Sequence, residues 1–262
     1  MAEIKHSRIE VTDGTLIPDK GEKSIFSAWK LAFFGAIALV IILPVVKPKP
    51  YFEILKFIPD GVLATFKVTV LSIILSFIIG LLTGLGRISR VTFFNRLATV
   101  YVEVIRGIPL LVQLFYIYYA LGKIVQVPRL ASAVIAMAVC YGAYMGEIFR
   151  AGILSIPKGQ MEAALALGLS RAQALRKVIL PQTVKVILPP IGNEFIALLK
   201  DSSLVSILAV SDLLRRGREY ASTTFMYFES YTMVALVYLI ITLFLSRLVA
   251  IMEERLVKRE KQ

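Results

Sequence analysis

Apolar residues occur in long runs along most of the chain, and polar residues gather between these runs. A helix needs about 20 apolar residues to cross a bilayer core of ~30 Å. Because the runs here reach that length, we expect an all-α, polytopic membrane bundle with about six transmembrane helices. The predicted spans are residues 28–46, 61–86, 97–121, 129–150, 184–208 and 228–250.

The chain before the second span is predicted to contain a polar tail, a first span and an interfacial helix. Residues 1–27 are polar and carry charges of both signs, which is typical of a cytoplasmic tail. The first span is followed by KPKP, where a signal peptide would have small residues for cleavage, so an uncleaved helix is favoured. Residues 51–60 mix aromatic and charged side chains and predict an interfacial helix that ends at Pro59.

The composition agrees with a membrane protein. Hydrophobic residues make up 57% of the chain, only 18% of residues are charged and the mean hydropathy is +0.75, whereas a soluble domain has about 25% charged residues. The net charge of +12 marks topology in such a chain, and we expect no nucleic acid as a partner.

Lys and Arg residues set the orientation of a polytopic chain. Six spans with both termini in the cytoplasm place about twice as many of them inside as outside, although the basic cluster at 215–218 falls outside. The spans make the lipid bilayer a partner of the chain.

The rare residues exclude several kinds of chemistry. The chain has one cysteine, Cys140, and one histidine, His6. It therefore has no disulfide framework, no zinc cluster and no catalytic triad with an internal histidine. Cys140 lies in an apolar run, where a buried, inert thiol is the favoured interpretation.

One polar stretch, residues 158–181, separates two apolar spans. Pro157 can open a helix, and Gly168 can take the left-handed position that ends it. Ser170 and Gln173 have the spacing of a capping box for a second helix, and we expect Leu180-Pro181 to stop that helix. The pattern predicts a helical hairpin that docks on a partner, since neither helix is long enough to be stable alone in water. A solvated loop that happens to be helical remains the alternative.

The hairpin resembles the EAA loop of permease subunits of bacterial ABC importers. The family pattern is E-A-A, a glycine four residues later, and then I-x-L-P; here Val178 stands where isoleucine is usual. The resemblance implies that the hairpin sits in a cleft of a separate ATPase and transmits its closure to the membrane domain. The residues that it assigns to this coupling are Gly159, Glu162, Ala163, Ala164, Gly168, Leu180 and Pro181.

Further segments are similar to the polar amino-acid branch, the histidine/glutamate/glutamine/arginine/opine group. They are GVLATFKVTVLS (61–72), IRGIPLLVQLFY (105–116), GEIFRAGILSIPKGQMEAALALG (146–168) and GNEFIALLKDSSLVSI (192–207). The resemblance implies an importer-type transmembrane domain at 58–255. It leaves 1–57 as a cytoplasmic tail with an extra first helix and an interfacial segment, and 256–262 as a second cytoplasmic tail.

The resemblance also implies a bacterial cytoplasmic (inner) membrane as the location, and it implies the partners. They are two ABC ATPase subunits that hold ATP and Mg²⁺, an extracytoplasmic substrate-binding protein, and a second permease subunit, either identical or a sister subunit. The chain has no GxxxxGK[ST] sequence for binding ATP itself, and we expect it to bind no cofactor or metal. It is thus expected to be a transporter subunit, not an enzyme.

Charged residues inside spans mark function or a partner, because each costs about 2.5–3.5 kcal/mol on insertion scales. Glu103 and Arg106 are three residues apart in the third span, before a kink expected at Gly107 and Pro109 that frees backbone carbonyls. We favour a structural ion pair over contact with the substrate for these two charged residues. Glu147 and Arg150 have the same spacing and are expected to fix the approach to the hairpin.

The fifth span carries the candidate substrate site. Pro189-Pro190 are expected to break its helix, so that a half-helix begins near the midplane with its positive end towards a substrate carboxylate. The candidate substrate-binding residues are Asn193, Glu194, Lys200, Asp201 and Ser202. Asn193 and Lys200 are expected to share one helix face, and Glu194 and Asp201 another. Tyr141 and Tyr144 could line the same cavity, but core packing is favoured for them.

These patterns favour the permease of an ATP-driven importer of a polar amino acid. The alternative is a stand-alone secondary amino-acid transporter, which usually contains an internal repeat; we find none in the sequence. A membrane enzyme is disfavoured because no activated nucleophile or metal cluster can be assembled. The carboxylates of Glu194 and Asp201 indicate a cationic or neutral cargo, and Lys200 weakens that indication.

Overall fold

The computed structural model describes residues 27–258, and within this range all regular structure is helical. The predicted cytoplasmic tail before Ser27 and the last residues of the C-terminal tail lie outside the described residues. The helices are α1 (Ala28–Val46), α2 (Pro48–Phe57), α3 (Pro59–Arg87), α4 (Thr92–Gly107), α5 (Leu110–Ile124), α6 (Arg129–Leu154), α7 (Lys158–Ala166), α8 (Arg171–Ala174), the π-helix η1 (Leu175–Ile179), α9 (Leu180–Asp201), the 3₁₀-helix η2 (Ser202–Leu208), α10 (Leu213–Thr224) and α11 (Tyr227–Lys258).

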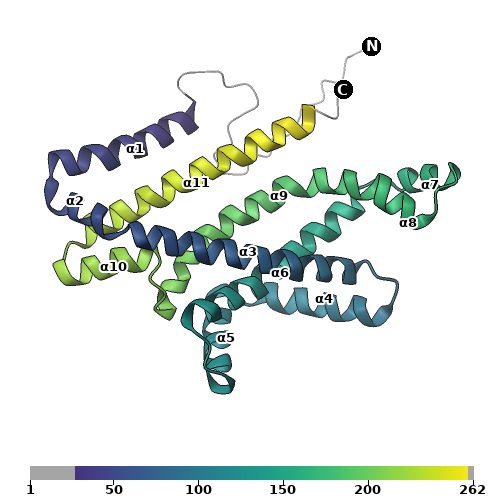
Figure 1. The fold of residues 1–262 in the computed structure, drawn as a ribbon, viewed down its shortest axis with the longest axis horizontal. Coiled ribbons are helices and arrows are strands. Elements are labelled where there is room, and N and C mark those ends of the chain that lie inside the picture. The colour runs from purple at the N-terminus through teal and green to yellow at the C-terminus, as the bar shows by residue number, and fades with distance from the viewer. Residues whose placement is uncertain (1–26, 259–262) are drawn as a thin grey trace, which may run out of the picture.

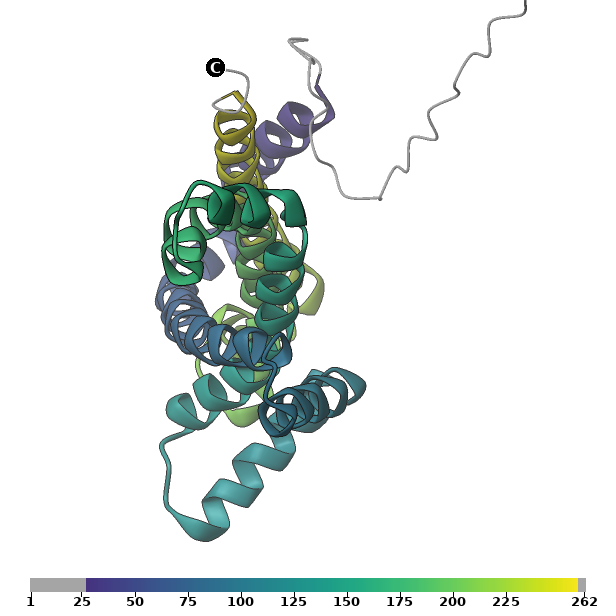
Figure 2. The same ribbon diagram turned by 90° about the vertical axis from the view of Figure 1, so that its right-hand side faces the viewer.

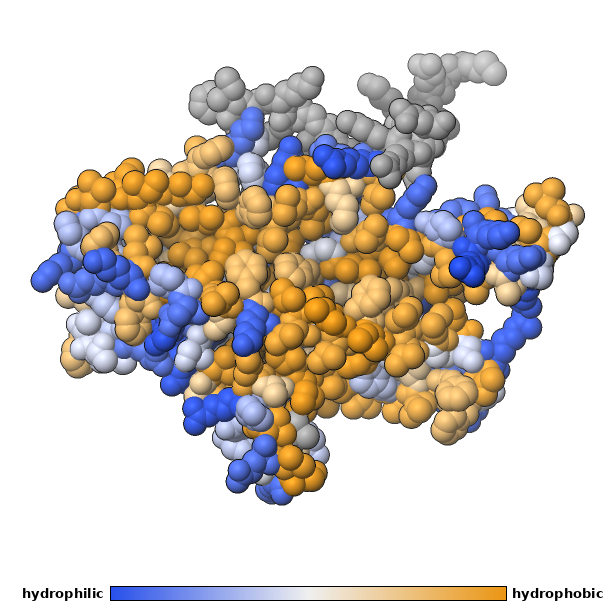
Figure 3. Space-filling view, viewed as in Figure 1, coloured by the Kyte–Doolittle hydropathy of each residue, from blue (hydrophilic) through white to orange (hydrophobic). Residues whose placement is uncertain are grey.

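The long helices run along one axis of the molecule (Figure 1). The α7–α8 hairpin lies at one end of this axis, and α2 and α10 lie at the other. A view turned by 90° brings the hairpin towards the reader and shows that α5 projects from the main bundle (Figure 2). The space-filling surface has a broad apolar band between two polar ends (Figure 3). This distribution fits a bilayer whose normal follows the long axis.

The all-α membrane bundle predicted from the sequence is confirmed, but the number of spans changes. Among the described residues, four helical stretches are long and apolar enough to cross a membrane, and the α4–α5 pair makes a fifth if it is one bent span. They are Ala28–Val46, Pro48–Arg87, Arg129–Leu154 and Tyr227–Leu256. Helix α9 is not among them, because polar residues such as Gln182, Lys185 and Asn193 interrupt its apolar sequence.

Two predicted spans were wrong in detail. The span at 97–121 is two helices that meet at an angle of 109°. The break falls at Ile108, which is extended and precedes Pro109, where α-helical geometry is disfavoured. The span at 184–208 leaves the α-helix at Asp201 and continues as the short 3₁₀-helix η2.

Helices α3 and α6 pack with their backbones almost in contact. Gly80 and Gly84 of α3 lie against α6, and Gly142 and Gly146 of α6 lie against α3: a Cβ at Gly84 would lie 2.7 Å from Phe149 Cβ, and one at Gly146 would lie 2.9 Å from Thr83 Cγ2. Both pairs have the small-x-x-x-small spacing that lets membrane helices approach closely. We call this contact the glycine seam, defined by these four glycines.

The N-terminal helices are fastened to the far end of the chain. The indole of Trp29 donates a hydrogen bond to the carbonyl of Leu243 on α11 (3.1 Å). At the end opposite the hairpin, the hydroxyl of Tyr220 donates to the carboxylate of Glu53 on α2 (3.0 Å), and Lys47 pairs with Glu229 (3.4 Å). Thus α1 and α2 are held to α10 and α11 by specific polar contacts.

Asp212 fixes the start of α10. Its carboxylate is fully buried and accepts hydrogen bonds from the backbone N–H groups of Leu214 (3.1 Å) and Arg215 (3.2 Å). This is the arrangement of a helix N-cap. Burial raises the pKa of the Asp212 carboxyl to about 6, and the two N–H groups partly oppose that rise.

The glycine seam makes a stability prediction. A Cβ at Gly80 would collide with Met145 Cβ and approach the Gly146 nitrogen to 3.0 Å, whereas a Cβ at Gly35 of α1 meets nothing within 4 Å. Overpacking costs about 1–3 kcal/mol and exceeds the ~1 kcal/mol that alanine gains over glycine inside a helix. We expect Gly80→Ala to lower the melting temperature of the purified protein in detergent and Gly35→Ala to leave it unchanged or raise it. Equal melting temperatures would show that the seam is not tightly packed.

Candidate functional site

The hairpin at the end of the bundle has the predicted first half. Helix α7 begins directly after Pro157, and Gly168 follows it with φ +79°, the left-handed region that favours glycine. The backbone N–H of Gly168 donates to the Leu165 carbonyl (3.0 Å), so the turn also satisfies a carbonyl at the helix end. The sequence prediction of a glycine turn here is confirmed.

The second half begins with the predicted capping box. The Ser170 hydroxyl accepts the Gln173 N–H (3.3 Å), and the Gln173 side-chain oxygen accepts the Ser170 N–H (2.9 Å). The predicted stop at Leu180-Pro181 is wrong, because the helix runs on through η1 into α9. Pro181 lies in the first turn of α9, directly after the π-helix, and the wider π turn lets the chain accommodate a residue without an N–H.

Most of the predicted coupling residues are on the hairpin surface. Gly159, Glu162, Ala163 and Gly168 are exposed, and Ala164 is buried within the hairpin. Leu180 and Pro181 are exposed where the hairpin joins α9. Leu167, beside the turn, leaves 84% of its surface exposed.

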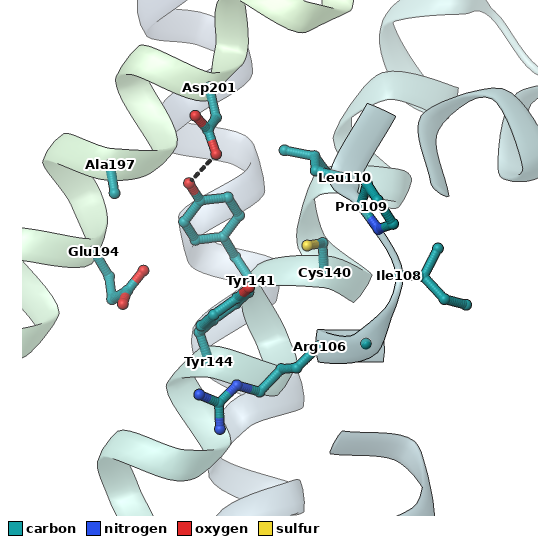
Figure 4. A pocket seen from close by; sticks show the side chains of 11 residues that line it. Arg106, Ile108, Pro109, Leu110, Cys140, Tyr141, Tyr144, Glu194, Ala197 and Asp201 are labelled. Atoms are coloured by element: carbon teal, nitrogen blue, oxygen red, sulfur yellow. Dashed lines mark hydrogen bonds between the residues drawn. The ribbon is translucent and has the colours of Figure 1, made fainter. Parts of the chain in front are cut away.

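A second feature, a partly open pocket of about 480 Å³, lies between the α4–α5 break, α6 and α9 (Figure 4). Its size is within the range of small-molecule sites. The residues that line it are Arg106, Gly107, Ile108, Pro109, Leu110, Cys140, Tyr141, Tyr144, Glu194, Ala197 and Asp201. Tyr141 is the thirteenth of the 26 residues of α6, counted from Arg129, so the pocket lies near the middle of that helix.

Helix α9 forms one wall of the pocket. Glu194, Ala197 and Asp201 are spaced i, i+3 and i+7 and share one face, as predicted for the two carboxylates. The Tyr141 hydroxyl donates a hydrogen bond to Asp201 Oδ2 (2.8 Å), which joins α6 to α9 across the pocket (Figure 4).

The predicted helix break at Pro189-Pro190 is wrong, since α9 is continuous through both prolines. Membrane helices tolerate proline because neighbouring groups re-satisfy the freed backbone. Because no half-helix begins there, no positive helix end supplies a site for a carboxylate.

The α4–α5 break forms the opposite wall. As expected, it frees backbone carbonyls, and the side-chain amide of Gln113 donates to two of them, those of Ile105 and Ile108 (2.7 Å each). The guanidinium of Arg106 lies over the Tyr144 ring, 5.2 Å from its centroid. It is the cation among the residues that line the pocket.

The interpretation of Glu103 and Arg106 as an ion pair was wrong. Glu103 does not pair with Arg106: it faces Arg87 of α3 at 3.9 Å, while Arg106 stacks on Tyr144. The spacing on α4 did not determine the partners of these residues, because α3 supplies Arg87 to Glu103 and α6 supplies Tyr144 to Arg106. The core packing predicted for Tyr141 and Tyr144 is confirmed, and both tyrosines also line the pocket.

The other candidate substrate residues do not line the pocket. Asn193 and Lys200 are exposed on other faces of α9, and Ser202 is buried with its hydroxyl donating to the Leu199 carbonyl (2.7 Å). Sequence reasoning missed Cys140 and Pro109 as lining residues and Gln113 as a support. The resemblance at 105–116 contained a signal for Pro109 and Gln113, since both lie in that segment.

The charges of the pocket suit a zwitterion. One guanidinium and two carboxylates line it, and Cys140, two tyrosines and apolar groups complete its walls. Arg can bind a carboxylate through two parallel hydrogen bonds, while a carboxylate suits an ammonium. No group of His, Cys, Asp and Glu residues that could hold a metal occurs within residues 27–258.

Comparisons with known proteins identify the class. Residues 72–258 match the family model described as binding-protein-dependent transport system inner membrane component. The chain belongs to this family. It is a multi-pass inner-membrane permease of an ABC importer of polar amino acids, and the ATPase is a separate subunit.

Particular relatives are similar over nearly their whole length. The glutamine transport system permease protein GlnP of Escherichia coli K12 is 40% identical over 200 residues, which is 75% of this chain and 91% of that protein. The L-cystine transport system permease protein TcyB of Bacillus subtilis is 42% identical over 198 residues, with 75% and 85% covered. The arginine transport system permease protein ArtQ of the same organism is 36% identical over 202 residues, with 76% and 92% covered.

Solved structures agree with these relatives. A crystal structure of an amino acid ABC transporter with histidines has a TM-score of 0.74 and 40% sequence identity, and the match covers 81% of this chain and 97% of that chain. The MetNI methionine ABC transporter in an inward-facing conformation shares the fold, with a TM-score of 0.63 and 21% identity over 79% of this chain and 97% of that chain.

Proposed function

We propose that the pocket between α4–α5, α6 and α9 receives the amino acid on its way through the membrane. The observation that carries this proposal is that Glu194 and Asp201 stand across the pocket from Arg106, beside the middle of the long helix α6 (Figure 4). Charged side chains inside a membrane cost free energy to insert, so their presence indicates a function. Arg106 would bind the α-carboxylate of the substrate, and Glu194 or Asp201 would bind its α-ammonium group.

The charges of the pocket also favour a class of cargo. With one cation and two carboxylates, the pocket keeps one negative charge after it has bound a zwitterion. Lys200 does not line the pocket and does not neutralise that charge there. The pocket therefore suits an amino acid with a neutral polar or a cationic side chain, because an anionic side chain would be repelled by the remaining negative charge. This class of cargo agrees with the substrates named for GlnP, TcyB and ArtQ.

The α7–α8 hairpin would carry the coupling to ATP hydrolysis. The hairpin is short, its second helix is capped and its Leu167 is exposed. These features suit an element that inserts into the cleft of an ATPase subunit. Two ATPase subunits holding ATP and Mg²⁺, two permease subunits and an extracytoplasmic binding protein would form the complex. In this proposal residues 58–255 are the transporter domain, 1–57 an added N-terminal segment, and 256–262 a tail, with both termini on the hairpin side of the membrane.

The direction of the helices supports that orientation. Helix α11 runs from the α10 end towards the hairpin end, and α1 runs back from the hairpin side towards α2 (Figure 1). A stand-alone secondary transporter, the alternative that the sequence left open, is disfavoured by membership in a family of binding-protein-dependent systems.

The hairpin proposal predicts that two substitutions at Gly168 differ in their effect on uptake. The position has φ +79°, which a β-branched residue strongly disfavours and asparagine tolerates. We expect Gly168→Val to abolish amino-acid uptake by the reconstituted complex while membrane insertion stays intact, and Gly168→Asn to retain most uptake. Uptake by the valine variant at the level of wild type would show that the hairpin is not the coupling element.

The pocket proposal predicts a loss of affinity in Glu194→Gln. Removing one charge-assisted hydrogen bond of ~1.5–3 kcal/mol should raise the concentration of amino acid needed for half-maximal stimulation of ATPase activity about tenfold or more. The measurement is a titration of the complete reconstituted complex, with the binding protein at a fixed concentration, against a panel of neutral, cationic and anionic amino acids. Lys200→Gln, on the same helix but outside the pocket, is the matched control and should behave as wild type. Identical titrations of Glu194→Gln and wild type would remove Glu194 from the substrate site.

A further inference from the structure

A second charged cluster lies outside the pocket, where α3 and α6 approach the hairpin. The carboxylate of Glu147 on α6 accepts hydrogen bonds from the guanidinium of Arg150 one turn later, with the Nε atom 3.0 Å from Oε2 and the Nη2 group on Oε1. The Nη1 group of Arg87 at the end of α3 donates to the same Oε2. The pairing of Glu147 with Arg150 was predicted from their spacing, and the contribution of Arg87 was not.

This cluster continues the glycine seam. Gly146 of α6 packs on Thr83 of α3, and the next residue of α6 is Glu147, which reaches Arg87 one turn further along α3. Between 16% and 30% of each of the three charged side chains is exposed, so water screens them only in part. Helices α3 and α6 are therefore joined by backbone packing in the bundle and by ionic bonds at the hairpin end.

Helix α6 connects the two features that transport requires. Tyr144, in the pocket wall, stands three residues before Glu147 on the same helix face. At the other side of the cluster, α6 ends at Leu154 and only residues 155–157 separate it from α7. A displacement of the hairpin thus reaches α6 first, a few turns from the pocket.

The other connection of the hairpin contains a π-helix. The hairpin joins α9 through η1, and π turns inside α-helices are frequent at functional sites. Helix α9, which carries Glu194 and Asp201, forms one wall of the pocket and is connected to the hairpin by η1. Helix α6 forms another wall, and the ionic cluster joins α6 to α3.

We propose that Arg87, Glu147 and Arg150 form an ionic clamp that transmits movement of the hairpin to the pocket. The clamp makes α3 and α6 turn as one body, so that a push on the hairpin moves Tyr141 and Tyr144 relative to Glu194 and Asp201. Without the clamp the end of α6 would yield locally, and ATP would be hydrolysed without a matching change in the pocket. This inference rests on the proposed coupling role of the hairpin and assigns its transmission to three positioning residues.

The test measures amino acid transported per ATP hydrolysed, by the complete complex in proteoliposomes. A structural defect lowers transport and hydrolysis together, whereas a broken clamp lowers their ratio. Coupling between sites is typically worth about 5- to 150-fold in an equilibrium constant, so Glu147→Gln should lower the ratio at least about fivefold. The matched control is Glu103→Gln, because Glu103 also faces Arg87 but at 3.9 Å and with 72% of its side chain exposed. It should keep the wild-type ratio.

A second variant makes the test independent of one substitution. Arg87→Gln alone should lower the ratio as Glu147→Gln does, and the double variant should be no worse than the more affected single variant, because the two residues act through one contact. An unchanged ratio in both single variants would overturn the proposal, as would an equal loss in Glu103→Gln. Failure of both single variants to assemble would also overturn it, since the cluster would then serve only folding.

The outcome separates the clamp from the hairpin. If Gly168→Val retains uptake, the hairpin proposal fails and the clamp has no movement to transmit. If Gly168→Val loses uptake while Glu147→Gln keeps the wild-type ratio, the hairpin proposal stands and the clamp fails.

Discussion

The close contact between α3 and α6 is the constraint on which the other features depend. The glycine seam lets the two helices approach closely, and such packing is specific because it relies on shape. Tyr141 and Tyr144 reach the pocket from the helix that the seam fixes, and the hairpin leaves from the end of the same helix. The position of α6 therefore sets both the pocket wall and the start of the hairpin. A bundle in which this pair could slide would have neither in a defined place.

Several polar groups of the pocket walls have partners within the bundle. At the α4–α5 break, Gln113 donates to two of the carbonyls that the lost helix turn exposes, so the bent segment can line a cavity. Asp201 accepts the Tyr141 hydroxyl, and Arg106 lies over an aromatic ring instead of a carboxylate. A guanidinium held by a ring keeps its hydrogen-bond donors available, which suits the recognition of a substrate carboxylate.

The sequence predicted what depends on local chemistry. Apolar runs gave the bundle, while Gly168 and the Ser170–Gln173 spacing gave the turn and the cap of the hairpin. It failed where tertiary context decides between alternatives. The prolines at 181, 189 and 190 predicted helix ends that the structure does not have. Before Pro181 the chain continues through a π turn, and at Pro189 and Pro190 α9 is continuous, since an interrupted backbone is costly inside a membrane. Glu103 and Arg106 have the spacing of a pair, but α3 offers Arg87 and α6 offers Tyr144. Single-helix spacing contains no information about which neighbouring helix comes close.

The central claim is that the pocket is part of the transport path and responds to the ATPase. Cys140 tests it directly, because it is the single cysteine of the chain, lines the pocket and is 3% exposed in this structure. The measurement is the rate at which a small thiol reagent labels Cys140 in the reconstituted complex, with and without ATP and with transported or non-transported amino acids. The account predicts that the labelling rate changes when ATP binds and that a transported amino acid slows labelling while a non-transported one does not. The same labelling rate under all of these conditions would contradict it.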